Sequence, residues 1–208
     1  MVRPATFAWS VRKWLLIAVS VILLTVVALL MLAVGLVTLF RARRFYSEVM
    51  AGSLGRALLW LWGIRVVVHA PQPMPRTQVV YISNHTSTID MFVLISLALP
   101  NTRFFLSGFL RAVLPFGVIG YLIGIFWTVP QANPGMRTRI FKAALRTLQR
   151  TGESVYLSPE GQRITSGAIG HFNKGAFHLA TELGAPIVPF YILIPAASDP
   201  GRGLDIRP

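Results

Sequence analysis

The sequence has no cysteine and only seven acidic residues among 208. Without cysteine the chain can form no disulfide and has no thiol nucleophile, and no redox compartment is indicated. Twenty basic residues, seventeen of them arginine, give a formal net charge of +13. Such an excess favours polyanionic partners: nucleic acid, anionic lipid headgroups or phosphorylated substrates.

Several catalytic patterns are also missing. There is no Gly-x-Ser-x-Gly elbow, which disfavours a typical α/β-hydrolase, and no Gly-x4-Gly-Lys-Ser/Thr phosphate loop. The four histidines lack the spacing of a zinc site, so we expect no metal. No recognised nucleic-acid motif accompanies the arginines, which leaves lipid and phosphorylated substrates as the favoured partners.

Apolar residues, in contrast, are abundant at 54%, and mean hydropathy is +0.61. The segment 14–40 is an uncharged run of 27 residues, and about 20 apolar residues cross a bilayer as a helix. A cleaved signal peptide would have a shorter apolar region with a small-residue cleavage site, whereas this run ends in FRARR. We therefore predict a membrane helix. Basic residues flank both ends equally, so its orientation stays open, and a re-entrant or in-plane helix also fits.

A second helix is expected over residues 46–63, lying on the membrane surface or packed on the domain that follows. Residues 1–63 are thus predicted to be an anchor, and residues 64–208 a separate domain. Within that domain, residues 112–129 form another uncharged stretch, interrupted by Pro115 and three glycines. We expect this stretch to face the membrane or line a lipid site rather than to span.

Strand and helix patterns alternate after residue 64. Strands are predicted at 65–70, 78–83, 103–106, 154–158 and 186–194, and helices at about 88–99, 136–150 and 174–183. This alternation predicts an α/β domain with a mainly parallel sheet flanked by helices. Sites in such sheets form beyond the carboxyl ends of the strands.

The first candidate site follows the strand 78–83. In the segment SNHTSTIDMF, His85 stands five residues before Asp90, which lies beside an apolar run. A carboxylate there is costly unless it is paired. With a helix beginning near Thr88, Asp90 would fall in its first turn and could accept the Nδ1–H of His85, leaving Nε2 as a general base. A structural histidine with an aspartate at a helix N-terminus is the alternative.

The second candidate site, SPEGQR, follows the strand 154–158. Gly161 allows a tight turn with accessible N–H groups, and Arg163 can grip a phosphate with two parallel hydrogen bonds. Glu160 could hold Arg163 in place or bind an acceptor hydroxyl. If both strands are parallel members of one sheet, His85 and Glu160 emerge at the same edge and form one site.

These blocks resemble the glycerolipid acyltransferase family, of the 1-acylglycerol-3-phosphate acyltransferase type. NHTSTID is similar to its Asn-His-x4-Asp signature and SPEGQR to its Pro-Glu-Gly-Thr-Arg block. FNKGAF (172–177) and APIVP (185–189) are similar to its third and fourth landmarks, in the usual order. The resemblance covers about residues 65–194. The chain ends soon after the fourth block, where the family often adds further strands, so two alternatives stay open: a C-terminally shortened domain, or a fragment of a longer sequence.

The resemblance implies an O-acyltransferase of phospholipid biosynthesis, with His85 as base and Asp90 orienting it. Asn84, Glu160, Gly161, Arg163 and Lys174 are then expected to bind substrate. The implied partners are a lysophospholipid acceptor, acyl-CoA or acyl carrier protein as donor, and membrane lipids, with no cofactor and no nucleic acid. The implied location is the inner or plasma membrane, with the catalytic domain on the cytoplasmic side.

One departure from the family concerns the acceptor. The family usually carries Gly-x-x-x-Ile-Asp-Arg before the helix 136–150, and its Arg is assigned to the acceptor's phosphate. Here the stretch is GIFWTVP, and Pro130 takes the place of that Arg. Two alternatives stay open: the same chemistry on a non-phosphate acceptor such as a lyso-aminolipid, and an inactive relative that binds anionic lipid.

Overall fold

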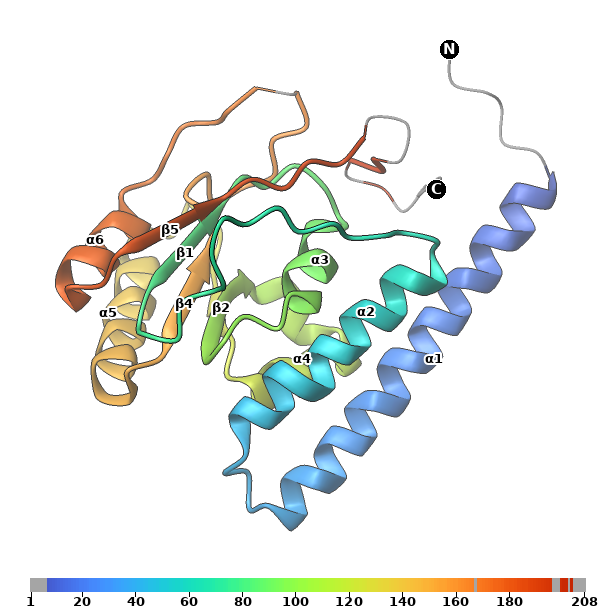
Figure 1. Cartoon of the computed structure of the whole chain (residues 1–208), viewed down its shortest axis with the longest axis horizontal. Helices are drawn as coiled ribbons and strands as arrows, with labels where there is room; N and C mark the ends of the chain where they lie inside the picture. The colour runs from blue at the N-terminus through green and yellow to red at the C-terminus, as the bar shows by residue number, and fades with distance from the viewer. Residues whose placement is uncertain (1–6, 167, 196–198, 202, 204–208) are drawn as a thin grey trace.

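A computed structural model of the chain describes residues 7–166, 168–195, 199–201 and 203. Its centre is a five-stranded sheet in the order β3-β2-β4-β1-β5, and every neighbouring pair is parallel. The predicted parallel α/β fold is therefore confirmed (Figure 1). The strands are β1 (Val80–Ser83), β2 (Thr102–Ser107), β3 (Phe126–Thr128), β4 (Ser154–Leu157) and β5 (Ile187–Phe190).

Helices cover both faces of this sheet. On one face, α5 (Pro134–Thr151) and α6 (Gly175–Leu183) bury Ala144, Leu148 and Leu179 against the strands. On the other face, α3 (Asp90–Ser96) packs Leu94 against Tyr81 and its neighbours. β1 and β4 are buried at every position, as uninterrupted apolar strands of a parallel sheet should be.

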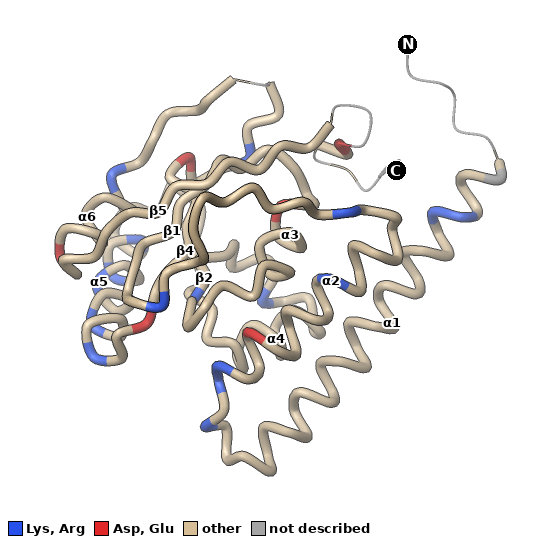
Figure 2. Tube along the Cα trace, in the orientation of Figure 1, with Lys and Arg blue, Asp and Glu red and all other residues tan. Residues whose placement is uncertain are grey.

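The N-terminal helices form a layer outside α3. α1 (Phe7–Val37) runs beside α2 (Gly52–Leu61) and packs on α4 (Leu114–Ile123) (Figure 1). Among the described residues, α1 is the one helix long and apolar enough to cross a membrane. Figure 2 shows basic residues at both ends of α1 and none along its middle. Many apolar side chains of α1 are exposed, as expected of a helix that contacts lipid.

The second N-terminal helix is not a regular α-helix throughout. Residues Phe45–Ala51 form a π-helix, and α2 follows directly. α2 buries Leu54 and Leu58, and it approaches α3 so closely that a Cβ on Gly55 would lie 2.9 Å from the Ser96 nitrogen. Packing on the domain, one of the two expectations, is thus observed, while Trp60 stays exposed on the outer side.

The predicted strand at 65–70 is wrong. No strand is assigned between α2 and β1, and Val67 and Val68 are exposed. A β-rich segment becomes a strand only when a neighbour accepts its hydrogen bonds, and no described segment pairs with this one. The helix after His85 also begins two residues later than Thr88, at Asp90.

A buried ion-pair cluster fastens the N-terminal helices to the amino end of the sheet. Arg43, in the connection after α1, and Arg103, on β2, both pair with Glu153, which directly precedes β4. Burial raises the pKa of the Glu153 carboxyl, but the Arg103 hydrogen bond and the two arginine charges outweigh burial and hold that pKa below its ordinary value. Burial lowers the pKa of Arg43, against the attraction of Glu153.

Candidate active site

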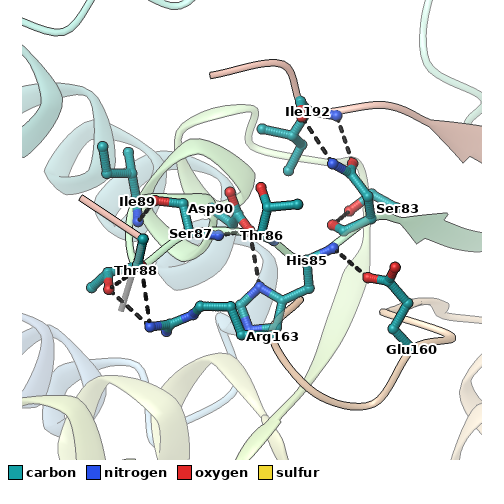
Figure 3. Close-up of polar contacts among 12 residues, drawn as sticks. Ser83, His85, Thr86, Ser87, Thr88, Ile89, Asp90, Glu160, Arg163 and Ile192 are labelled. Atoms are coloured by element: carbon teal, nitrogen blue, oxygen red, sulfur yellow. Dashed lines mark hydrogen bonds and ion pairs between the residues drawn. The ribbon is translucent and has the colours of Figure 1, made fainter. Parts of the chain in front are cut away.

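The loops after β1 and β4 meet at the carboxyl edge of the sheet. Because β1 and β4 are hydrogen-bonded neighbours, His85 and Glu160 emerge side by side. The His85 backbone N–H donates to Glu160 Oε2 over 2.8 Å, as Figure 3 shows. The two sequence motifs thus form one site, 75 residues apart in the chain.

Asp90 organises the histidine loop. Its Oδ2 lies 2.9 Å from His85 Nδ1 and also accepts the backbone N–H groups of Thr86 and Ser87, at 2.8 and 2.9 Å. Asp90 is fully buried, whereas the His85 side chain keeps 31% of its surface exposed. An ionised Asp90 therefore fixes the tautomer with the proton on Nδ1, and Nε2 is left free to take a proton.

Glu160 forms hydrogen bonds with the backbone of the neighbouring loops and none with Arg163. Its carboxylate is buried, and its second oxygen accepts the Gly170 N–H at 2.9 Å. The expectation that Glu160 holds Arg163 is wrong. Arg163 instead donates to Thr88 Oγ1 at 2.9 Å and, more weakly, to the Gly201 carbonyl at 3.4 Å. These bonds hold the guanidinium at the histidine loop, on Thr88 (Figure 3).

Two polar atoms at this site are buried with bonding capacity left over. Within the described part of the chain, Asp90 Oδ1 and Arg163 Nε have no hydrogen-bond partner. Buried polar atoms are nearly always bonded, so each unsatisfied one calls for an explanation, such as a catalytic role or a bound water. The pattern fits a site that binds a polar ligand.

The other expected substrate-binding residues have different surroundings. The Asn84 amide binds the backbone of Ile192 through both of its ends, at 2.9 and 2.8 Å, so it ties β1 to the segment after β5. Lys174 directly precedes α6 and is exposed, and no described residue receives a hydrogen bond or ion pair from its ammonium. Gly161 has φ +64°, a conformation that favours glycine.

Some residues that shape the site were not anticipated from the sequence. The Asn173 amide donates to the carbonyls of Pro159 and Glu160, both at 3.0 Å, and so fixes the turn. Asn173 lies in the FNKGAF block, which was the available signal. Beneath the site, the Tyr156 hydroxyl bonds Ser83 Oγ at 2.9 Å, and burial raises the pKa of Tyr156, so the phenol stays protonated.

An apolar groove adjoins the histidine loop. It has a volume of about 650 Å³ and lies between the irregular segment 63–75, the segment 188–195 and the α3 side chains Val93 and Leu97. Ile89, the residue before Asp90, contributes to its wall. The stretch 112–129, expected to line a lipid site, does not line this groove and instead packs through α4 on α1.

The comparisons with known proteins agree with this geometry. The family described as Acyltransferase matches residues 65–193, which is more than half of the chain. The chain belongs to this acyltransferase family. The matched region begins just after α2 and contains all five strands.

Named members of the family are similar over part of their length. A chloroplastic 1-acyl-sn-glycerol-3-phosphate acyltransferase of Brassica napus is 34% identical over 123 residues, 58% of this chain and 34% of that protein. The Limnanthes alba enzyme of that name is 28% identical over 180 residues, 83% of this chain and 61% of its own. This acyltransferase chain thus spans from one third to under two thirds of the length of these relatives.

A solved structure shares the fold. The 1-acyl-sn-glycerophosphate (LPA) acyltransferase of Thermotoga maritima superposes with a TM-score of 0.69 at 18% identity, covering 86% of this chain and 72% of that one. The coverage exceeds the matched family region, so the likeness extends into the N-terminal helices as well as the sheet.

Proposed function

We propose that this acyltransferase is membrane-bound and moves a fatty acyl group from acyl-CoA or acyl carrier protein to the free hydroxyl of 1-acylglycerol-3-phosphate. The observation that carries the proposal is the contact between His85 and a buried Asp90 at the sheet's carboxyl edge, with Arg163 bound to Thr88 of the same loop. The named relatives are 1-acyl-sn-glycerol-3-phosphate acyltransferases, which supports this acceptor.

The reaction needs one base and a site for the developing charge. His85 Nε2 takes the proton of the acceptor hydroxyl as the oxygen attacks the thioester carbon, and the new C–O bond forms. Asp90 stabilises the resulting imidazolium. The tetrahedral oxyanion collapses, the C–S bond breaks, and the thiolate leaves with the proton from His85. A positioned base of this kind contributes about 10²–10⁴-fold to the rate.

The apolar surfaces serve the lipid substrates. The groove beside Ile89 offers an acyl chain a place next to the base, and the uncharged part of α1 after Lys13 offers the bilayer a matching surface. The basic residues along α5 would attract an anionic leaflet, with each basic group near the surface adding roughly 1 kcal/mol. Their number supports membrane association of the domain as well as of the helix.

The catalytic domain is proposed to lie on the cytoplasmic side, where acyl-CoA and acyl carrier protein are found. The absence of cysteine makes this testable. Lys142→Cys, on an exposed position of α5, would introduce a single thiol. A membrane-impermeant maleimide should label it in inverted vesicles and not in intact cells. Labelling in intact cells would place the domain outside.

The activity is tested by thiol release from acyl-CoA or acyl carrier protein thioesters in purified, detergent-solubilised protein. The assay compares wild type with His85→Ala, and uses His178→Ala, exposed on α6, as the matched control. The acceptor panel contains 1-acylglycerol-3-phosphate, a lyso-aminolipid and monoacylglycerol. We expect release that requires 1-acylglycerol-3-phosphate and His85, with the control unaffected.

Each other outcome selects an alternative. Release that needs His85 but prefers the lyso-aminolipid would keep the chemistry and replace the acceptor. Lipid binding with no acceptor-dependent release would indicate an inactive lipid-binding relative. Full activity in His85→Ala would overturn the proposed mechanism.

A further inference from the structure

Two side chains from the connection after β3 reach the Gly161 turn. A Cβ built on Gly161 would lie 3.2 Å from Gln131 Nε2 and 3.9 Å from an Arg137 guanidinium nitrogen. Gln131 follows β3, and Arg137 lies in the first turns of α5. Both side-chain nitrogens therefore lie against the turn, on the side where Gly161 has no side chain.

Arg137 differs from the other basic residues of its helix. Arg137 is half-buried against the turn, whereas the others are exposed: Arg139, Lys142, Arg146 and Arg150. Within the described part of the chain, neither Arg137 nor Gln131 has a side-chain hydrogen bond or an ion pair. A guanidinium is a permanent cation with several N–H donors, so an anion bound beside it would gain charge-assisted hydrogen bonds.

Among the described residues, the Glu160 carboxylate pairs with neither Arg137 nor Gln131. Both oxygens of Glu160 are already bonded to the backbone N–H groups of His85 and Gly170. The Asn173 amide, also beside Gly161, donates its hydrogens to the carbonyls of Pro159 and Glu160. The donors left over are the Arg137 guanidinium and the amide nitrogen of Gln131, and both can donate N–H groups to an anion.

These donors suit a phosphate. A guanidinium gives a phosphate two parallel charge-assisted hydrogen bonds, and a neighbouring amide adds a third. Both proposed substrates supply phosphate, but at different distances from the reaction. In 1-acylglycerol-3-phosphate the phosphate-bearing carbon is adjacent to the carbon that carries the reacting hydroxyl. In acyl-CoA the whole pantetheine arm separates the phosphates from the thioester.

The position of the subsite favours the acceptor. Gly161 directly follows Glu160. The Glu160 carboxylate lies 2.8 Å from the backbone nitrogen of His85, the residue whose side chain serves as base. We propose that Arg137 and Gln131 bind the phosphate group of the lysophospholipid acceptor. This inference rests on the proposed function and names two residues that set acceptor specificity. It also supplies a cation to a site where Pro130 had removed the expected arginine.

The test compares Arg137→Ala with Arg139→Ala, which removes the same charge two positions along the helix from an exposed site. A charge-assisted hydrogen bond is strong enough to change affinity roughly tenfold or more. We therefore expect Arg137→Ala to raise the KM for 1-acylglycerol-3-phosphate about tenfold or more with little change in kcat. Arg137→Lys should recover part of the loss and Gln131→Ala should lose less, while Arg139→Ala should match wild type.

Two further arms separate the sources of phosphate. Turnover of monoacylglycerol, which has no phosphate, should be equal in wild type and Arg137→Ala. The KM for acyl-CoA should also be unchanged. An increase confined to acyl-CoA, absent with an acyl-N-acetylcysteamine thioester, would assign the subsite to the donor and overturn the acceptor assignment. Equal acceptor KM values for Arg137→Ala and Arg139→Ala would overturn the subsite itself.

A binding measurement keeps the inference independent of turnover. Glycerol 3-phosphate should bind wild type and Arg139→Ala at least about tenfold more tightly than Arg137→Ala. That result would support the subsite even if no thiol release were found and the proposed function failed. Acceptor-dependent, His85-dependent turnover with identical glycerol 3-phosphate binding in both variants would leave the proposed function intact and refute the subsite.

Discussion

Two buried glutamates flank β4, and their partners differ completely. Glu153 precedes the strand and pairs with two arginines, Arg43 and Arg103. Glu160 follows the strand and accepts only backbone N–H groups, from His85 and Gly170. Among the residues that the structure describes, no carboxylate pairs with the nearby cations Arg163 and Arg137. At the amino end of β4 the charged groups pair with one another. At the carboxyl end the arginines stay available for a ligand.

The different partners of Glu153 and Glu160 distinguish charged residues that stabilise the fold from charged residues that can bind a ligand. A buried charge whose partners are all within the protein contributes to the order of the fold and has nothing left for a substrate. A carboxylate satisfied by neutral N–H groups shapes a loop without neutralising the arginines around it. The comparison therefore predicts that substitutions at the carboxyl end affect turnover, and that substitutions at the amino end affect stability.

The largest effect is expected from Asp90→Asn. The substitution keeps the size of the side chain but removes the charge that orients His85 and stabilises its imidazolium. We expect kcat to fall by about 10²–10⁴-fold, measured by thiol release at saturating acceptor. Circular dichroism at the assay temperature would establish that the variant is folded. A folded Asp90→Asn protein with wild-type kcat would mean that His85 does not act through Asp90.

The carboxyl end was largely predictable from the sequence, and the amino end was not. His85, Asp90 and Glu160 stand in short motifs after apolar runs, and a parallel sheet brings such positions to one edge. The ion-pair cluster joins residues 110 positions apart, Arg43 and Glu153, and no local pattern marks them. When charged residues lie in separate loops, the sequence does not show which of them will form an ion pair in the folded protein.

Two errors in the sequence-based reading have the same origin. The segment 65–70 has the composition of a strand, but strand formation depends on a neighbour that composition does not reveal. Helix periodicity over residues 136–150 likewise puts Arg137 on the outer face with the other basic residues, yet Arg137 lies in the first turns and reaches the Gly161 turn. Periodicity assigns faces along a helix and says little about its ends, where loops from elsewhere approach.

Glu153→Gln should destabilise the protein without changing the site. It would leave two buried guanidinium groups facing a neutral amide, and breaking a buried ion pair typically costs about 3–5 kcal/mol. Denaturant unfolding in detergent would measure the loss, with Glu182→Gln on exposed α6 as control. Below its unfolding transition the variant should keep the wild-type kcat. A large loss of kcat in the folded variant would mean that the two ends of β4 are coupled.

The pH dependence of stability isolates the same carboxylate. The folded pKa of Glu153 is lowered, because its arginines outweigh the effect of burial. Its stabilising contribution is therefore complete above the unfolded value of about 4.3 and is lost as pH falls through the lowered folded value. Glu153→Gln lacks this contribution. The difference in unfolding free energy between wild type and Glu153→Gln should therefore be constant at neutral pH and shrink below about pH 4.3.

Thr88→Val gives the smallest effect and the finest test of the carboxyl end. It removes the hydroxyl that accepts a 2.9 Å hydrogen bond from Arg163 while keeping the shape of the side chain. Arg163 then loses the closer of its two hydrogen-bond partners, and its guanidinium is held less firmly for the substrate.

A hydrogen bond to a charged group contributes about 1.5–3 kcal/mol, and the retained Gly201 contact reduces the loss in Thr88→Val. We expect a several-fold rise in acceptor KM with kcat and unfolding free energy close to wild type. A fall in unfolding free energy with an unchanged acceptor KM would mean that the Thr88–Arg163 hydrogen bond stabilises the fold, as the Glu153 ion pairs do. The two ends of β4 would then differ less in function than their charge patterns indicate.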